Sequence, residues 1–266
     1  GRFSPEEQLL LVEEDKDGSV PCDEQTDWQR IANCQLGAAD APETFLVWGD
    51  SHGRSLLPGF DAAMKILDRR GLYVGIPGCA SLLGLSRVNQ PFPQLCFPLG
   101  DHVLSVLDTH PDIRTVYLVS RWSVYAQGIR FQHSPTARMT MVIDAESPGP
   151  DLAENPRAFG RALERTIVEL RRRGLKVVVV TQVPDIGYHV SIATVMNARL
   201  GRVLDLRTSR AEHDAHQASS HEMFQPFVAK GDITLARLDE LLCDDQMCQI
   251  TTQDGLPAYW DDNHLS

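Results

Sequence analysis

Residues 45–53 read Phe-Leu-Val-Trp-Gly-Asp-Ser-His-Gly, and they decide the fold that we expect for this chain. The apolar run 45–48 is typical of a buried strand, and a helical pattern of apolar residues begins after it. Gly49 permits a sharp turn between the two. In an open α/β sheet, such a strand-to-helix turn lies at the carboxyl edge, where ligands bind. This stretch therefore predicts the type of sheet and also the place of a functional site.

Ser51 allows two interpretations at this turn. Asp50 or Ser51 could cap the helix by accepting its first backbone N–H groups. Alternatively, Ser51 is a nucleophile, placed where unpaired N–H groups and the helix dipole stabilise an oxyanion. The end of the chain favours the nucleophile, because Asp261 stands three residues before His264. A histidine can take the proton of a serine as general base, and a carboxylate fixes the tautomer of that histidine.

The rest of the chain alternates between expected strands and helices. This alternation predicts an α/β fold, a three-layer α/β/α sandwich with a central parallel sheet. Residues 1–43 are acidic and are expected to be an irregular lead-in, a linker from a probable membrane domain, before a catalytic domain at 44–266. Residues 127–155 are expected to be irregular or hairpin-like. The expected strands are 44–49, 72–76, 115–119, 175–180 and 232–235, and the expected helices are 50–70, 98–109 and 156–173, with 189–230 partly helical.

The composition argues against several functions. A formal net charge of −11 does not suit a nucleic-acid or anionic-membrane surface, which needs clustered Lys and Arg. No apolar run approaches the ~18 residues of a membrane span. His213 and His216, with acidic neighbours, invite a metal site, but a solvated polar helix explains them better. We therefore expect no metal and no cofactor.

The six cysteines fall into three pairs that are close in sequence. An even count with this grouping suggests disulfides and an oxidising compartment, although free thiols stay an alternative. A zinc site is disfavoured because the chain has no CxxC motif and no Cys–His cluster with ligand spacing. Spacing alone does not fix connectivity, and the pairing that we favour is Cys22–Cys34, Cys79–Cys96 and Cys243–Cys248.

Two further segments follow expected strands and so belong at the same edge of the sheet. Gly78 could present its backbone N–H to an oxyanion, or it could simply form a turn after Pro77. Arg121 could bind a carboxylate or a sugar hydroxyl, and Trp122 could stack on a sugar ring. Alternatively, Arg121 is a surface arginine and Trp122 a core tryptophan. Position at the end of a strand raises the chance of a functional role, so both interpretations stay open.

With Gly-Asp-Ser-His at 49–52 and Asp-x-x-His-Leu-Ser at 261–266, the chain resembles the SGNH (GDSL-like) hydrolase superfamily, whose fold is flavodoxin-like. More narrowly, residues 44–266 resemble the SGNH domain at the C-terminus of membrane-bound acyltransferase family 3 proteins. The Ser-Arg-Trp block at 120–122 and the Cys243–Cys248 pair are also similar to that subgroup. The chain departs from the superfamily in having no Gly-x-Asn-Asp block, which puts the third oxyanion donor in doubt.

The resemblance implies roles for individual residues. Ser51 would be the nucleophile, His264 the base and Asp261 its carboxylate, while adjacent Asp262 is the alternative carboxylate. The backbone N–H groups of Ser51 and Gly78 would bind the oxyanion. The implied protein is a periplasmic acyl-transfer domain, tethered to the inner membrane, that forms an acyl-serine and acetylates a surface polysaccharide or lipopolysaccharide.

In that assignment, the membrane acyltransferase domain of the same protein would deliver the acyl group. Two alternatives stay open: a stand-alone carbohydrate O-acetyl esterase and a non-catalytic module that binds glycan or the membrane partner.

Overall fold

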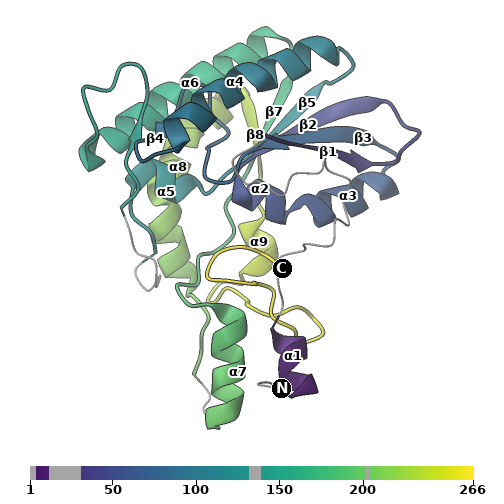
Figure 1. The fold of residues 1–266 in the computed structure, drawn as a ribbon, viewed down its shortest axis with the longest axis vertical. Helices are drawn as coiled ribbons and strands as arrows, with labels where there is room; N and C mark the ends of the chain where they lie inside the picture. The colour runs from purple at the N-terminus through teal and green to yellow at the C-terminus, as the bar shows by residue number, and fades with distance from the viewer. Residues whose placement is uncertain (1–3, 12–30, 132–138, 202–203) are drawn as a thin grey trace.

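The computed structural model describes residues 4–11, 31–131, 139–201 and 204–266, and Figure 1 shows its ribbon. Six strands form one sheet in the order β1-β3-β2-β5-β7-β8. All neighbours are parallel except β1, which pairs antiparallel with β3 at one edge. From β2 onward, the parallel strands have the 2-1-3-4-5 order of flavodoxin-like sheets. The strands are β1 (Ala32–Gly37), β2 (Glu43–Gly49), β3 (Arg70–Gly75), β5 (Thr115–Val119), β7 (Lys176–Val180) and β8 (Ile233–Ala236).

Helices cover both faces of the sheet, which confirms the three-layer prediction (Figure 1). Alternate residues of β2 divide between two apolar cores, because successive side chains of a strand point to opposite faces. Leu46 and Trp48 join the larger core under α4, α6 and α8, whereas Phe45 and Val47 join the smaller core beside α3. The helices are α1 (Pro5–Leu10), α2 (Ser51–Ser55), α3 (Leu57–Ile66), α4 (Phe92–Thr109), α5 (Trp122–Gln127), α6 (Asn155–Arg172), α7 (Val190–Leu200), α8 (Arg210–Ala229) and α9 (Asp239–Leu242).

The five predicted strands are confirmed to within two residues at each end. The helix expected over 50–70 is wrong in two respects: it is divided into α2 and α3 at Leu56, and α3 ends at Ile66, so that Arg70 already begins β3. Pro58 stands in the first turn of α3, and its ring nitrogen has no hydrogen to donate to the preceding turn. The short helix α2 therefore carries only the turn that contains Ser51.

Three strands lie where the sequence pattern is weak. Residues 32–37, expected to be irregular, form the edge strand β1, in which Cys34 and Leu36 are buried and Gln35 between them is exposed. β6 (Val142–Ile143) lies in the region 127–155 that was expected to be irregular or hairpin-like, but it pairs antiparallel with β4 (Ser86–Arg87), which lies outside that region. β4 and β6 have only two residues each, too few for a period-two alternation to stand out in the sequence.

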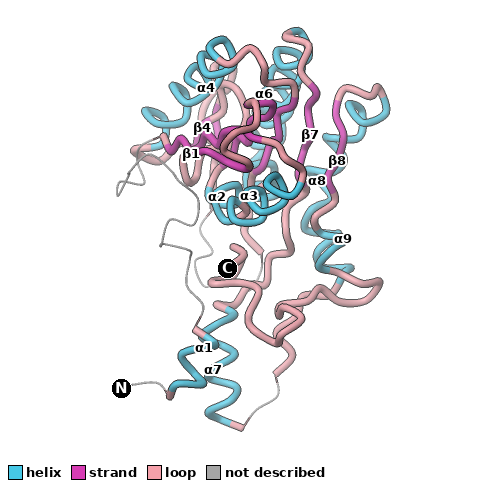
Figure 2. Tube along the Cα trace, turned by 90° about the vertical axis from the view of Figure 1, so that its right-hand side faces the viewer, coloured by secondary structure: helices cyan, strands magenta, loops and turns pink. Residues whose placement is uncertain are grey.

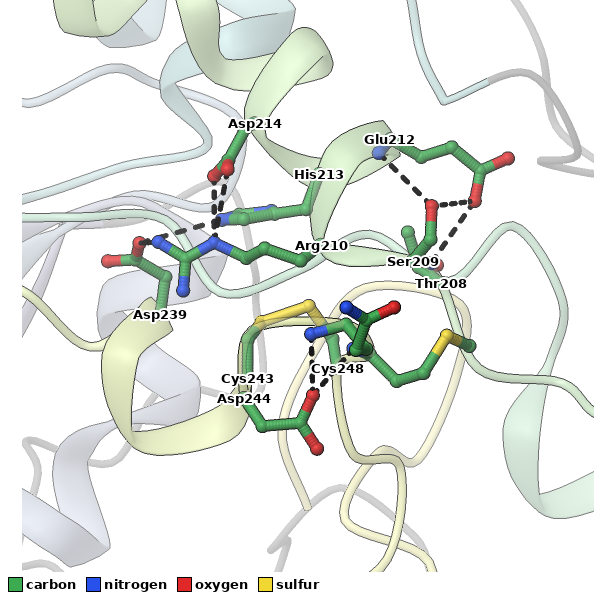
Figure 3. The surroundings of a disulfide bond; sticks show 12 residues. Thr208, Ser209, Arg210, Glu212, His213, Asp214, Asp239, Cys243, Asp244 and Cys248 are labelled. Atoms are coloured by element: carbon green, nitrogen blue, oxygen red, sulfur yellow. Dashed lines mark hydrogen bonds and ion pairs between the residues drawn. A yellow bond between two sulfur atoms is a disulfide. The ribbon is translucent and has the colours of Figure 1, made fainter.

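Disulfide bonds join Cys79 to Cys96 and Cys243 to Cys248, as predicted. Cys22, the predicted partner of Cys34, lies outside the described residues. Figure 3 shows the second bond beside Asp239, whose buried carboxylate accepts hydrogen bonds from Arg237 and, at 2.6 Å, from Thr181 just after β7. The start of the C-terminal segment is thereby fixed to the carboxyl edge of the sheet.

Helices α1 and α7 lie side by side at the end of the molecule that is remote from the sheet, as both views show (Figures 1 and 2). Arg199 of α7 forms a 2.5 Å ion pair with Glu7 of α1, which is one contact between them. Among the described residues, no helix has the length and apolar character needed to cross a membrane.

Candidate active site

The turn after β2 carries Asp50 and Ser51 at the carboxyl edge of the sheet. Asp50 caps α2, because its Oδ1 accepts the backbone N–H of His52 at 2.8 Å. Its Oδ2 accepts the backbone N–H of Arg121 at 3.0 Å and the hydroxyl of Tyr125 at 2.9 Å. Burial raises the pKa of the Asp50 carboxyl group. Since Asp50 forms the cap, the hydroxyl of Ser51 is left for another partner.

Ser51, His264 and Asp261 form a continuous chain of hydrogen bonds. The hydroxyl of Ser51 lies 2.8 Å from Nε2 of His264, and Nδ1 of His264 lies 2.7 Å from Oδ2 of Asp261. Burial acts to raise the pKa of Asp261, but the hydrogen bond to His264 and two backbone N–H groups outweigh it, so this pKa is below its ordinary value. An ionised Asp261 accepts the Nδ1 proton of His264 and leaves Nε2 able to accept the proton of Ser51.

Asp262, the alternative carboxylate, has a different position. Its Oδ1 accepts a hydrogen bond from Nδ2 of Asn263 at 2.6 Å, and its backbone carbonyl accepts the N–H of Ile186 at 2.8 Å. The carbonyl of Asp261 accepts the N–H of Val190 in the same way. These backbone bonds hold the C-terminal segment against the loop that follows β7, with the side chain of Asp261 directed at His264.

His52 links the nucleophile turn to the loop that carries the histidine. Its Nε2 lies 2.9 Å from Oδ1 of Asn263, and its ring centroid lies 4.6 Å from that of His264. Because Nδ2 of Asn263 donates to Asp262, Oδ1 faces His52, and Nε2 of His52 must be the donor. Burial lowers the pKa of His52 well below its ordinary value, so the ring is held neutral.

We predict that His52→Phe lowers kcat at least tenfold. The variant keeps an aromatic ring but leaves Oδ1 of Asn263 buried without its donor, which weakens the hold on the loop of His264. His52→Gln, whose amide can still donate, should restore much of the rate. Ester hydrolysis measured in steady state checks both, and wild-type kcat in His52→Phe would contradict the positioning role.

The wild type and His52→Phe also test the pH dependence of stability. Because the folded pKa of His52 lies below the ordinary 6.5, the unfolded chain binds more protons as the pH falls below 6.5. The contribution of the neutral ring to stability is therefore complete above pH 6.5 and is progressively lost below it. Urea denaturation should show a steeper acid-side loss of unfolding free energy in the wild type than in His52→Phe.

Trp260 is the second aromatic neighbour of His264. Its ring is stacked on the imidazole, with the centroids 5.3 Å apart and the planes at 16°. Trp260, His52 and Asn263 were not predicted as site residues. His52 and Asn263 lie within the two motifs that reveal the triad, and Trp260 directly precedes the second, so proximity in sequence is the signal for all three.

A cavity of about 370 Å³ opens beside Ser51 and His264. It is lined by the triad and by the predicted residues Gly78 and Arg121. Two arginines that were not predicted, Arg87 and Arg130, line it as well. Its lining residues are Asp50, Ser51, Gly78, Arg87, Arg121, Val124, Tyr125, Arg130, Thr140, His189, Trp260, Asp261, Asp262, Asn263 and His264.

Gly78 lies in this lining with a φ of +83°, a conformation that favours glycine. A Cβ at this position would come within 2.6 Å of the Phe92 ring, so the turn has no room for a side chain. Ser120, in the block that replaces Gly-x-Asn-Asp, does not line the cavity; its hydroxyl accepts the backbone N–H of Ser81 at 2.9 Å. Neither observation supplies a side-chain donor in place of the missing asparagine.

Arg121 and Trp122 point in different directions. Arg121 lines the cavity, and its guanidinium is buried and lies 2.5 Å from Oδ1 of Asp185, so it is not the surface arginine of the alternative interpretation. Trp122 is buried in the core, where its indole donates to the carbonyl of Val180 and its ring meets Phe159 edge to face. A sugar-stacking role does not fit this position of Trp122.

The two histidines considered for a metal site were expected on a solvated helix, which is wrong for His213, because it is buried; His216 is partly buried. His216 lies 3.2 Å from Asp185 and 3.0 Å from the hydroxyl of Ser123, and His213 is buried 3.8 Å from Asp239. Over the described ranges, no three His, Cys, Asp or Glu side chains gather in a way that could hold a metal ion.

Comparisons with known proteins identify the family and the fold of the chain. A family model described as "SGNH domain (fused to AT3 domains)" matches residues 21–266. A solved structure, the periplasmic domain of a lipopolysaccharide acetyltransferase from Salmonella ser. Paratyphi A, superposes with a TM-score of 0.57. The match covers 85% of this chain and 78% of the other at 14% sequence identity, so it shows a shared fold. A search of curated protein sequences found no match.

Proposed function

Because the chain belongs to the family of SGNH domains that are fused to AT3 domains, we propose that it is the extracytoplasmic acyl-transfer domain of a polysaccharide O-acetyltransferase. The observation that carries this proposal is the hydrogen-bonded chain from Ser51 through His264 to Asp261, which opens on a cavity large enough for a sugar-sized group. A serine activated in this way performs acyl transfer in unrelated folds.

In the first half-reaction, Oγ of Ser51 attacks the carbonyl carbon of the acyl donor while Nε2 of His264 takes the hydroxyl proton. Asp261 stabilises the imidazolium that forms. The negative charge on the carbonyl oxygen is held by the backbone N–H of Ser51, which has no partner within its own helix, and by that of Gly78. When the tetrahedral adduct collapses, the leaving group departs with the proton from His264, and the acyl-serine remains.

In the second half-reaction, a hydroxyl of the acceptor gives its proton to His264 and attacks the acyl-serine. Collapse releases the new ester and returns the proton to Ser51. With a sugar hydroxyl as acceptor the result is transfer, and with water it is ester hydrolysis. The similarity of the fold to the periplasmic domain of a Salmonella lipopolysaccharide acetyltransferase supports a lipopolysaccharide or polysaccharide acceptor and a periplasmic location for this chain.

The AT3 domain of the family description is the proposed membrane partner that delivers the acyl group. The disulfide bonds Cys79–Cys96 and Cys243–Cys248 are consistent with an oxidising compartment on the outer side of a membrane. The acyl group is proposed to be acetyl, and no cofactor is needed for this chemistry.

Intact mass after treatment with a serine-directed fluorophosphonate tests the proposal. We expect one adduct on the wild-type chain and none on Ser51→Ala, because only a serine beside a general base reacts readily with this reagent. The untreated wild-type chain is then incubated with 4-nitrophenyl acetate and a sugar. The ratio of acetylated sugar to free acetate distinguishes transfer from hydrolysis. A well-folded wild-type chain that forms no adduct would contradict the proposal and favour a non-catalytic binding module.

A further inference from the structure

Arg87 lies at the wall of the cavity. It belongs to the short strand β4, and its guanidinium lies over the ring of Phe92, 4.1 Å from the centroid. One of its terminal nitrogens is 3.2 Å from the point that a Cβ on Gly78 would occupy. The absence of a side chain at Gly78 therefore makes room for both Phe92 and the arginine that lies on it.

Arg87 lacks a counter-ion in the part of the chain that the structure describes. Arg121 has Asp185 as its partner at 2.5 Å, whereas no such ion pair is formed by Arg87, and its Nε is buried without a hydrogen-bond acceptor. The three carboxylates of the lining are engaged elsewhere: Asp50 accepts three protein donors, Asp261 is bound to His264, and Asp262 accepts the amide of Asn263. A partly buried guanidinium group whose Nε is shielded from water and has no acceptor favours an anion.

Other positive charges lie near Arg87. Burial lowers the pKa of Arg130, and the charges of Arg121 and Arg87 lower it further, whereas the charges of Asp262 and Asp185 act to raise it. They gather in one cavity of a chain whose net charge is −11. The net charge of the chain therefore does not account for three arginines in one cavity, and an anionic ligand bound in the cavity would reduce their mutual repulsion.

We propose that Arg87 binds an anionic group of the substrate, a carboxylate or a phosphate, beside Ser51. This inference rests on the proposed function, because it names the chemistry of the molecule that exchanges an acyl group with Ser51. A guanidinium suits both anions, since its planar set of donors can make two parallel hydrogen bonds. Stacking on Phe92 holds that plane before the ligand arrives, which reduces the entropy lost on binding.

Two arms of one experiment distinguish the source of the anion. In the acceptor arm, acetyl transfer from 4-nitrophenyl acetate is measured to methyl glucuronide and to methyl glucoside, which differ in one carboxylate. In the donor arm, acetyl phosphate is compared with 4-nitrophenyl acetate. We expect Arg87→Gln to lower kcat/KM for the anionic member of one arm about ten- to hundredfold, and to affect its neutral counterpart much less.

Three controls keep the result interpretable. Arg87→Lys retains the charge without the planar set of donors and should recover part of the selectivity. Arg157→Gln removes a cation whose side chain is 70% exposed on α6, and it should leave the selectivity unchanged. Raising the salt concentration should reduce the preference of the wild type for the anionic substrate, because an accessible cavity is screened.

Equal losses on anionic and neutral substrates in Arg87→Gln would overturn the proposal, since they would mean that Arg87 stabilises the reacting oxyanion. Absence of charge selectivity in both arms would overturn it as well. Failure of the proposed function is seen separately, as a wild-type chain that fluorophosphonate does not label. In that case, calorimetric binding of methyl glucuronide against methyl glucoside to Ser51→Ala, with and without Arg87→Gln, decides the role of Arg87 alone.

Discussion

Asp261→Asn is expected to lower kcat for acyl transfer and for ester hydrolysis on the order of 10⁴-fold, with little change in the fold. The Oδ1 of Asp261 accepts the backbone N–H groups of Asn263 and His264 at 2.9 and 2.7 Å, and the carbonyl oxygen of an asparagine can accept both. The turn therefore survives. The amide NH₂ then takes the place of Oδ2 and presents hydrogens to Nδ1 of His264.

That single exchange reverses the tautomer of the histidine. With a donor facing Nδ1, His264 carries its proton on Nε2, which lies 2.8 Å from the hydroxyl of Ser51. A protonated Nε2 cannot accept the proton of the nucleophile, and the imidazolium loses its carboxylate. The lowered pKa of Asp261 means that the wild-type carboxylate stays ionised even in moderately acidic solution, so this contrast holds across the assay range.

Asp262→Asn is the matched control for this prediction. Its carbonyl oxygen still accepts the amide of Asn263, and the backbone bond to Ile186 is unaffected. We expect its kcat to stay within a few-fold of the wild type. Steady-state assays with 4-nitrophenyl acetate measure kcat for the wild type, Asp261→Asn and Asp262→Asn, and thermal melts compare their stability. A larger loss in Asp262→Asn than in Asp261→Asn would show that the neighbouring carboxylate serves the histidine.

The sheet could be predicted because its central strands are buried on both faces. Residues 175–180 and 115–119 are nearly continuous β-branched or aromatic runs, which is the pattern of parallel strands under two layers of helix. β1 escaped prediction because it is an edge strand, where Gln35 faces outward and only Cys34 and Leu36 are buried. The boundary between α2 and α3 depends on one proline, Pro58, whose effect the apolar periodicity does not record.

The triad could be predicted because its three members lie in two short motifs with a known chemical logic. The rest of the site could not, because it is assembled by tertiary packing. Arg87 reaches the cavity only through the two-residue pairing of β4 with β6, and its place beside Phe92 depends on the turn at Gly78. Nothing in the sequence around Arg87 distinguishes it from a surface arginine.

The Ser-Arg-Trp block shows how position in the chain can mislead. Both Arg121 and Trp122 follow β5 at the edge where ligands bind, yet only the arginine reaches the cavity. Trp122 begins α5, and that helix turns its ring away from the edge into the core between Phe159 and Phe224. A residue at the end of a strand faces either the site or the core, and the next helix decides which.

Trp122→Ala is expected to destabilise the protein by about 3–5 kcal/mol, with catalysis affected only through the fraction that stays folded. The side chain is 1% exposed, and its removal would leave a cavity between two phenylalanine rings and the carbonyl of Val180 without its indole donor. Such a loss is a large share of the ~5–15 kcal/mol that holds a typical domain folded. Urea denaturation monitored by circular dichroism measures it.

Trp260→Ala provides the opposite case, because this tryptophan lines the cavity and stacks on His264. We expect its unfolding free energy to stay closer to that of the wild type, while kcat and the KM for a sugar acceptor change. If Trp122 instead bound sugar, Trp122→Ala would weaken acceptor binding at an unchanged denaturation midpoint. The two variants therefore distinguish a core tryptophan from a site tryptophan. A cavity in the core lowers the unfolding free energy, whereas a lost contact in the site changes kcat and KM and leaves the unfolding free energy nearly unchanged.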